Sequence, residues 1–238
     1  MNDLNEKQIL KSWHANAKAW ADAIQNQEIE SRNLVTNDAI LDAVFSCKPV
    51  TVLDVGCGEG WLTRSLVAQG LDVTGVDVVP ELINKAKQRG PGKFQLCSYE
   101  TITNELLSKE DKGRGVKYDA VVCNFSLIGK ESVEQLLNAV PALLSAKGYL
   151  LIQTLHPLMA CIESDVDGAS VYGDGWRSGS WTGFGPEFKD PAPWYFRTLE
   201  SWSQLLGKSG LRILELREPL HPLTKKPASL IFICASSA

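Results

Sequence analysis

Short apolar runs alternate with amphipathic stretches through the middle of the chain. The apolar runs predict strands over 50–55, 72–77, 93–97, 118–124 and 148–155, and the amphipathic stretches predict helices over 61–69, 80–90 and 131–145. Near-continuous apolar strands separated by helices are typical of a parallel sheet covered on both faces. The pattern therefore predicts an α/β, doubly wound fold.

Two regions depart from this alternation. Residues 1–47 carry Trp13, Ala17, Trp20 and Ile24 at helical spacing, which predicts helix. Residues 156–197 are rich in glycine, proline and aromatic residues, and such long segments with little periodicity are usually functional. The chain then continues with a helix over 199–208 and strands over 211–217 and 229–235. No helix is predicted between these two strands, so we expect them to pair as an antiparallel hairpin.

Composition narrows the class of protein. A chain of 238 residues is long enough for one ample domain with an extension. The net charge of −4 and the lack of a basic tract disfavour a nucleic-acid partner. No apolar run approaches the length of a membrane span, and the early Asp3, Glu6 and Lys7 do not suit a secretory signal. Six scattered cysteines without metal-ligand spacing are typical of free thiols, which predicts a cytoplasmic protein without a bound metal.

The run Val52–Gly60 carries the clearest chemical signal. It is a predicted strand with Asp54 near its end, followed by Gly56, Gly58 and Gly60 on alternate positions. Such a turn lets the backbone approach a nucleotide at the end of a parallel sheet. In a dinucleotide fingerprint the third glycine would stand at position 61, which here is Trp61. A nicotinamide cofactor is therefore disfavoured, although a nicotinamide-dependent oxidoreductase remains the alternative enzyme class.

A ligand with a cationic amino-acid tail and no phosphate suits a carboxylate beside the turn. S-adenosylmethionine has these properties, and Asp77 at the end of the next predicted strand can accept its ribose hydroxyls. The pattern thus favours S-adenosylmethionine as the cofactor. A non-catalytic protein that binds this cofactor remains a third possibility, because transfer by proximity requires no obligatory catalytic residue.

Residues 50–155 resemble a class I S-adenosylmethionine-dependent methyltransferase. The resemblance is carried by Val52–Gly60, by Gly75-Val76-Asp77 and by the run from Tyr118 to Asn124. It implies a mostly parallel seven-stranded sheet with the last strand inserted antiparallel. It also implies a cofactor site in which the glycine loop holds the methionine part, Asp77 holds the ribose, and the backbone near Asn124 meets the sulfonium. The family's usual acidic adenine partner is replaced here by Ser98 and Tyr99, and the neighbouring Cys57, Val78 and Phe125 complete the expected site.

The ends of the chain are similar to a subgroup that methylates small molecules. The matching runs are Trp13–Trp20, Ser31-Arg32, His156-Pro157, Tyr195–Leu199 and Glu218-Pro219. The resemblance implies a helical lid over residues 1–47 and a methyltransferase domain over 48–238, with the insertion 156–197 covering the substrate. Trp20 and Arg32 are then expected beside the cofactor, with plain helix packing and a solvated surface arginine as the alternatives. The expected substrate wall comprises Trp13, Trp176, Trp181 and Tyr195.

The expected reaction is an in-line methyl transfer to a small, partly apolar molecule. His156 directly follows a predicted strand, which makes it a candidate general base, although a His-Pro corner that only ties down its loop is the alternative. Asn124 is not followed by the Pro-Pro-aromatic run of enzymes that methylate nucleic-acid bases. We therefore expect a small-molecule substrate, and a monomer or homodimer. Carboxylate, hydroxyl and amine acceptors all stay open.

Overall fold

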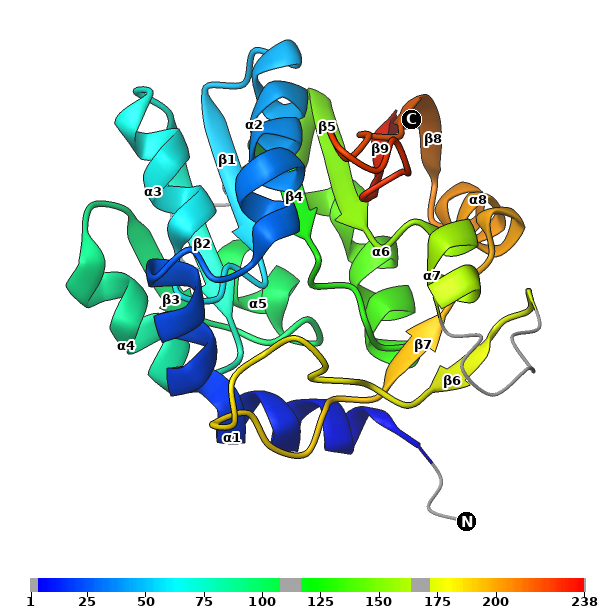
Figure 1. The fold of residues 1–238 in the computed structure, drawn as a ribbon. Helices are drawn as coiled ribbons and strands as arrows, with labels where there is room; N and C mark the ends of the chain where they lie inside the picture. Colours follow the sequence, from blue (N-terminus) through cyan, green and yellow to red (C-terminus); the bar gives the residue numbers. More distant parts are fainter. Residues whose placement is uncertain (1–3, 108–116, 164–171, 238) are drawn as a thin grey trace.

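One seven-stranded sheet forms the centre of the computed structural model, which describes residues 4–107, 117–163 and 172–237 (Figure 1). The strand order is β3-β2-β1-β4-β5-β9-β8. β1 to β5 are parallel, while β9 runs antiparallel to both of its neighbours. This arrangement confirms the predicted doubly wound sheet and its antiparallel last strand. The strands span β1 Thr51–Val55, β2 Asp72–Asp77, β3 Lys93–Leu96, β4 Tyr118–Asn124, β5 Leu144–Thr154, β8 Leu211–Arg217 and β9 Leu230–Ser236.

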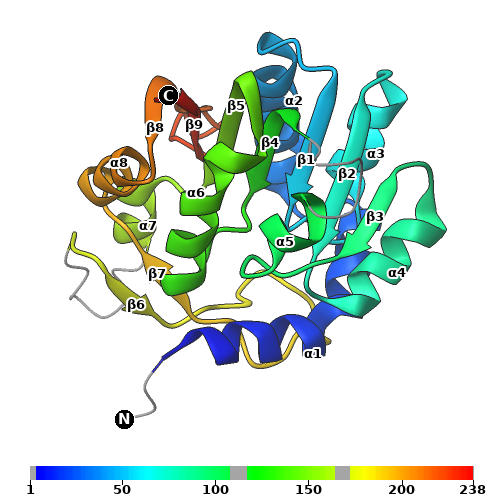
Figure 2. The ribbon, with the colours of Figure 1, turned by 180° about the vertical axis from the view of Figure 1, so that it is seen from behind.

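Helices cover both faces of the sheet, because the apolar side chains of its inner strands point alternately to either side. In β1, Val52 packs with α2 and α3, whereas Leu53 packs with α5, α6 and α8. The two sets of helices lie on opposite sides of the sheet in Figures 1 and 2. The helices span α2 Asn37–Ser46, α3 Trp61–Ala68, α4 Pro80–Arg89, α5 Ile102–Leu107, α6 Glu131–Leu143, α7 Pro157–Glu163 and α8 Leu199–Lys208.

Helix α1 (Glu6–Gln25) lies across the carboxyl ends of the parallel strands (Figure 1). It begins with a capping box in which the Asn5 side chain accepts from the first turn and the Gln8 side chain accepts from the Asn5 N–H. A π-helical turn at Arg32–Thr36 then leads into α2. We call residues 178–193 the strap, because this segment runs beside α1 between β6 (Gly175–Arg177) and β7 (Trp194–Phe196).

The structure adds elements that the hydrophobic pattern does not predict. α5 and α7 are too short for a clear helical period, and β6 and β7 pair as a three-residue hairpin within the predicted insertion. β5 begins at Leu144, four residues earlier than expected, because Leu144 already has an extended backbone after α6. Residues 164–171 of the insertion lie outside the described residues. Within the described ranges, no helix combines the length and apolar character needed to span a bilayer.

Candidate functional site

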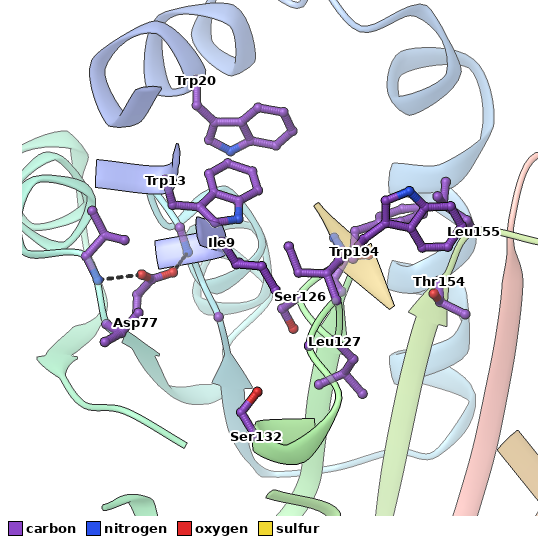
Figure 3. A pocket seen from close by; sticks show the side chains of 18 of the residues that line it. Ile9, Trp13, Trp20, Asp77, Ser126, Leu127, Ser132, Thr154, Leu155 and Trp194 are labelled. Carbon is purple, nitrogen blue, oxygen red and sulfur yellow. Dashed lines mark hydrogen bonds between the residues drawn. The ribbon is translucent and has the colours of Figure 1, made fainter. Parts of the chain in front are cut away.

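A cavity of about 550 Å³ opens where the parallel strands end, under α1 and the strap. Figure 3 shows Asp77 at one side of it and Thr154, Leu155 and Trp194 at the other, with Trp13 and Trp20 of α1 above. This volume is within the range of sites for small molecules and cofactors. The cavity is lined by most of the predicted site residues: Trp13, Trp20, Arg32, Gly56, Cys57, Gly58, Asp77, Val78, Ser98, Tyr99, Asn124, Phe125, Trp181 and Tyr195.

The glycine loop is shaped for close backbone approach. Gly58 has φ +58°, and a Cβ added there would meet only Trp20 Nε1, at 3.9 Å, so the loop leaves open space under α1. Gly60 has φ +85° and begins α3, and a Cβ there would lie 2.6 Å from the Phe94 ring. Gly58 is therefore required for its backbone conformation, and Gly60 for its conformation and for its packing against Phe94. Gly60 itself does not line the cavity.

Asp77 joins the glycine loop to the start of α4. Its Oδ2 accepts from the Gly58 N–H at 2.9 Å, and its Oδ1 accepts from the Val79 N–H at 2.8 Å. Burial raises the pKa of Asp77, while these backbone hydrogen bonds act in the opposite direction. The carboxylate also lines the cavity, so it faces whatever molecule occupies this end.

Asp54 lies apart from the cavity. Its side chain is 1% exposed, and its Oδ2 accepts from Thr63 Oγ1 of α3 at 2.8 Å. Burial raises its pKa to about 7, against the lowering effect of the Thr63 hydrogen bond. Asp54 thus connects β1 to α3 next to the glycine loop, and it does not line the cavity.

Side-chain hydrogen bonds join the segment after β4 to the segment after β3 and to the end of β1. The Tyr99 hydroxyl donates to the Ser126 carbonyl oxygen at 3.0 Å, and Ser126 Oγ donates to the Val55 carbonyl oxygen at 2.7 Å. Burial raises the pKa of Tyr99, which keeps this phenol protonated as a donor. Ser98 and Tyr99 both line the cavity.

Strain is stored directly after β4. Phe125 has φ +53°, an uncommon conformation for a bulky residue, and its N–H donates to the Gln153 carbonyl oxygen at 2.8 Å. The preceding Asn124 has a buried Oδ1 without a hydrogen-bond partner. A buried acceptor in this state indicates a site for a donor or cation in the cavity.

Five aromatic residues form what we call the aromatic cap, over the glycine-loop end of the cavity. Trp13 and Trp20 of α1 lie 5.2 Å apart, and Trp181 of the strap lies 6.1 Å from Trp13. Phe184 lies 6.2 Å from Trp20 and completes the contact between helix and strap with Phe188. The aromatic residues of the predicted segment therefore divide, because those of the strap pack here and those of β6 and β7 lie elsewhere.

The aromatic residues of β7 form the wall at the other end. Trp194, Tyr195, Phe196 and Arg197 line the cavity there. Trp176, predicted to be in the same wall, lies in β6, 5.6 Å from the Tyr195 ring, and does not line the cavity.

The sequence analysis missed Glu59, which lines the cavity and is 2% exposed. One of its oxygens, Oε2, pairs with Arg64 at 2.6 Å and with Arg89 at 3.1 Å, while Oε1 is buried without a partner. Nearby, Arg32 lies over the Trp61 ring at 4.8 Å and has a buried Nη2 without a partner. Burial lowers the pKa of Arg32 to about 10, while Glu59 acts to raise it.

His156 is turned away from the cavity, although Leu155 and Pro157 on either side of it line the cavity. Its ring is 5% exposed, and Nε2 lies 2.7 Å from Glu218 Oε1 in the loop between β8 and β9. This geometry suits a side chain that fastens a loop, and the catalytic role of His156 stays a prediction. Among the described residues, no group of three or more potential ligands is placed to hold a metal ion.

Known sequences similar to this chain include a methyltransferase profile and curated methyltransferases. The profile of a methyltransferase domain matches residues 12–216. A ubiquinone biosynthesis O-methyltransferase of Xanthomonas oryzae pv. oryzae is 32% identical over 161 residues, 67% of this chain and 66% of that protein. A protein of the same description from Xylella fastidiosa is 34% identical over 118 residues, 50% of this chain and 47% of its own. The chain thus spans less than two thirds of the length of these curated relatives.

Solved structures share the fold at lower identity. The plantazolicin methyltransferase BamL, in complex with a triazolic desmethylPZN analog and S-adenosylhomocysteine, has a TM-score of 0.65 at 16% identity, covering 97% of this chain and 96% of its own. A 1,6-didemethyltoxoflavin-N1-methyltransferase of Burkholderia thailandensis has a TM-score of 0.60 at 19% identity, covering 98% and 87%. With the profile match, the glycine loop and the antiparallel last strand, these findings show that the chain belongs to the class I S-adenosylmethionine-dependent methyltransferases.

Proposed function

We propose that this protein transfers a methyl group from S-adenosylmethionine to a small-molecule acceptor. The observation that carries the proposal is one cavity with the glycine loop and Asp77 at one end and an aromatic wall at the other. Such a cavity can align a donor and an acceptor for in-line displacement and exclude water. The cofactor supplies an electrophilic methyl group on a positively charged sulfur.

The unpartnered polar atoms near the glycine loop fit this cofactor. The buried Nη2 of Arg32 can donate to its carboxylate, and the buried Oε1 of Glu59 can accept from its ammonium group. Asp77 can accept from the ribose hydroxyls, which favours their binding over a phosphate. Ser98 and Tyr99 are then beside the adenine, as the sequence predicts.

The aromatic cap supports the same proposal. Trp20 Nε1 is the nearest atom to the open space over Gly58, so its ring lies beside the expected methionine part. Aromatic faces attract cations such as a sulfonium, and the contact of Trp13 with Trp181 covers this end of the cavity. We propose that Trp13 and Trp181 also contact the acceptor from the cap and that Tyr195 does so from the wall. Residues 1–47 and 156–197 would then act as the lid and the substrate cover of a methyltransferase domain over 48–238.

The acidic net charge and the cavity of about 550 Å³ with aromatic residues in its lining favour a small molecule over a polynucleotide. We further propose a cytoplasmic monomer or homodimer. All six cysteines are free thiols and five of them are buried, which suits a reducing compartment.

Calorimetry with S-adenosylhomocysteine tests the proposal. We expect a micromolar Kd, raised by about tenfold or more in Asp77→Ala because that variant loses the ribose acceptors and the link to Gly58. Asp72→Ala is the matched control, because Asp72 lies in the same strand but pairs with Lys93 on the surface. Absence of binding of both S-adenosylmethionine and S-adenosylhomocysteine would contradict the proposal, and NADH binding in a fluorescence titration would favour an oxidoreductase instead.

A further inference from the structure

The cavity has a cation at each end. Arg32 lies at the glycine-loop end, over the rings of Trp20 and Trp61. Arg197 lies at the other end, after β7, and is 4% exposed. S-adenosylmethionine has a single carboxylate, which the proposed function assigns to Arg32. The second arginine therefore remains to be explained.

Arg197 is held in place by backbone carbonyl oxygens and by aromatic rings. Its Nη1 donates to the Gly129 carbonyl oxygen at 2.8 Å and its Nη2 to the Lys130 carbonyl oxygen at 3.0 Å. The guanidinium lies over the rings of Tyr195 and Trp202, with its Cζ 4.9 and 5.2 Å from the ring centroids. Among the described residues no carboxylate lies within ion-pair distance of it, and a guanidinium has three further N–H donors. A buried arginine in this state favours an anionic ligand.

The lining of the cavity also restricts which acceptors can react. Within the part of the chain that the structure describes, it contains no histidine and no lysine. Of its carboxylates, Glu59 is paired with Arg64 and Arg89, and Asp77 is engaged by two backbone N–H groups. Glu100 follows Tyr99 at the cofactor end.

Glu6 is the carboxylate nearest the acceptor end, and it is engaged as a helix cap. Its Oε1 accepts from the N–H groups of Lys130 and Ser132 and from Ser132 Oγ, at the start of α6. Among the described lining residues, the acceptor end offers donors and a cation, and Glu6 already caps α6. An acceptor that reacts here has to arrive with its lone pair already available.

We propose that the acceptor is a carboxylate on a molecule with a flat apolar body, and that Arg197 binds this carboxylate. The inference rests on the proposed methyl transfer and names its substrate class. One carboxylate oxygen pairs with the guanidinium, and the other donates its electron pair to the methyl carbon. The carbon–sulfur bond breaks with its electrons left on sulfur, which becomes a neutral thioether. The products are a methyl ester and S-adenosylhomocysteine, and no proton has to be removed.

The walls around Arg197 suit the rest of such an acceptor. Trp194 and Leu155 face the cavity at this end, with Leu127 on the β4 side (Figure 3). Aromatic and aliphatic walls bind a flat apolar body through burial and offset stacking.

A binding experiment tests the role of Arg197 apart from turnover. The protein, saturated with S-adenosylhomocysteine, is titrated with naphthalene-2-carboxylate and indole-3-acetate, and then with the two corresponding primary amides. We expect each carboxylate to bind at least about tenfold more tightly than its amide, a preference that Arg197→Gln abolishes and Arg197→Lys partly restores. Arg177→Gln is the control, because Arg177 lies over the Phe196 ring but does not line the cavity. Equal binding of acids and amides by the unaltered protein would overturn the proposal.

Turnover provides a second test that needs no variant. The protein receives cofactor labelled in its methyl group, a metabolite extract and the two acids, and the products are treated with mild alkali. Methyl esters release labelled methanol, whereas methyl ethers and methylamines keep the label. Label in base-stable products would overturn the carboxylate proposal and leave the proposed methyl transfer intact. Failure to bind S-adenosylhomocysteine would instead remove the proposed function itself.

Discussion

The side chain of Asn16 is hydrogen bonded in both directions to the backbone of Lys189. Asn16 Nδ2 donates to the Lys189 carbonyl oxygen at 2.7 Å, and the Lys189 N–H donates to Asn16 Oδ1 at 2.8 Å. Asn16 is fully buried on α1, and Lys189 belongs to the strap. One amide therefore joins two segments that are far apart in sequence and that together cover the cavity.

Asn16→Ala should loosen the strap. The substitution leaves a backbone donor and acceptor without partners, at a cost of about 1–3 kcal/mol for each group that stays buried. We expect faster hydrogen exchange of the amides of residues 181–190. Asn33→Ala is the control, because it removes only an exposed hydrogen bond between Asn33 and Gln27. Hydrogen exchange in the strap should not change in this variant. Unchanged exchange in Asn16→Ala would show that other contacts hold the strap.

The pair of His156 and Glu218 should contribute to stability more than to turnover. Removing the Glu218 side chain leaves His156 Nε2 buried without its partner, at a cost of about 1–2 kcal/mol. We expect His156→Ala and Glu218→Ala to lower the unfolding temperature, to show coupling in a double-mutant cycle, and to keep kcat within about threefold. A fall in kcat of more than about a hundredfold at unchanged stability would establish His156 as the general base.

Two glycines with similar backbone angles should differ in their cost of substitution. Gly60→Ala combines a left-handed conformation with a clash against Phe94, which together cost about 2–4 kcal/mol. Gly70 has φ +89°, with no atom within 4 Å of an added Cβ, so Gly70→Ala should cost only about 1–2 kcal/mol. Denaturant unfolding measures both values. Equal costs would mean that the Phe94 ring gives way freely.

Trp20 should matter for cofactor affinity, and Trp176 should not. Trp20→Leu removes the ring nearest the space over Gly58, and we expect it to raise the Kd for S-adenosylmethionine by about tenfold. Trp176→Leu removes an aromatic ring that does not line the cavity, so it should leave this Kd unchanged. Calorimetry on both variants provides the comparison, and equal losses would indicate a general effect on folding.

The buried Asp54 should make the protein less stable as the pH rises. Its pKa is about 7 in the folded protein against 3.8 ordinarily, so between these values the folded state holds a proton that the unfolded state has lost. The free energy of unfolding should therefore fall from about pH 4 to pH 7, by up to about 4 kcal/mol from this group. Urea unfolding at several pH values measures the slope.

Asp54→Asn should flatten that slope, because an uncharged amide oxygen can still accept from Thr63. Asp119→Asn should instead remove a contribution that makes the protein more stable as the pH rises through the acidic range. Burial acts to raise the pKa of Asp119, but hydrogen bonds from Thr51, Val50 and Ser145 outweigh it and lower the pKa. Its stabilising effect is lost as the pH falls. If Asp54→Asn keeps the slope of the unaltered protein, another group is its source.

The sequence predicted the sheet well because its buried strands are short continuous apolar runs that alternate with longer amphipathic helices. Asp77 and the glycine loop were equally visible, since strand ends place neighbouring residues at the same edge. The direction of a side chain was not visible in this way. His156 lies between two cavity-lining residues and turns to Glu218, a contact over 62 positions. Glu59 and Arg197 were missed as site residues for a similar reason, because contacts that orient their side chains, with Arg89 and with Gly129, come from other elements.

Helix α1 is anchored along its whole length: Glu6 caps α6, Asn16 holds the strap, and Arg89 donates to the Ala21 carbonyl oxygen at 2.8 Å. A ligand that leaves past α1 has to break several of these bonds together. In many enzymes with such covers the opening of the cover, rather than the chemical step, limits the overall rate. A rapid first burst of product followed by a slower steady phase is the kinetic behaviour that this helix implies.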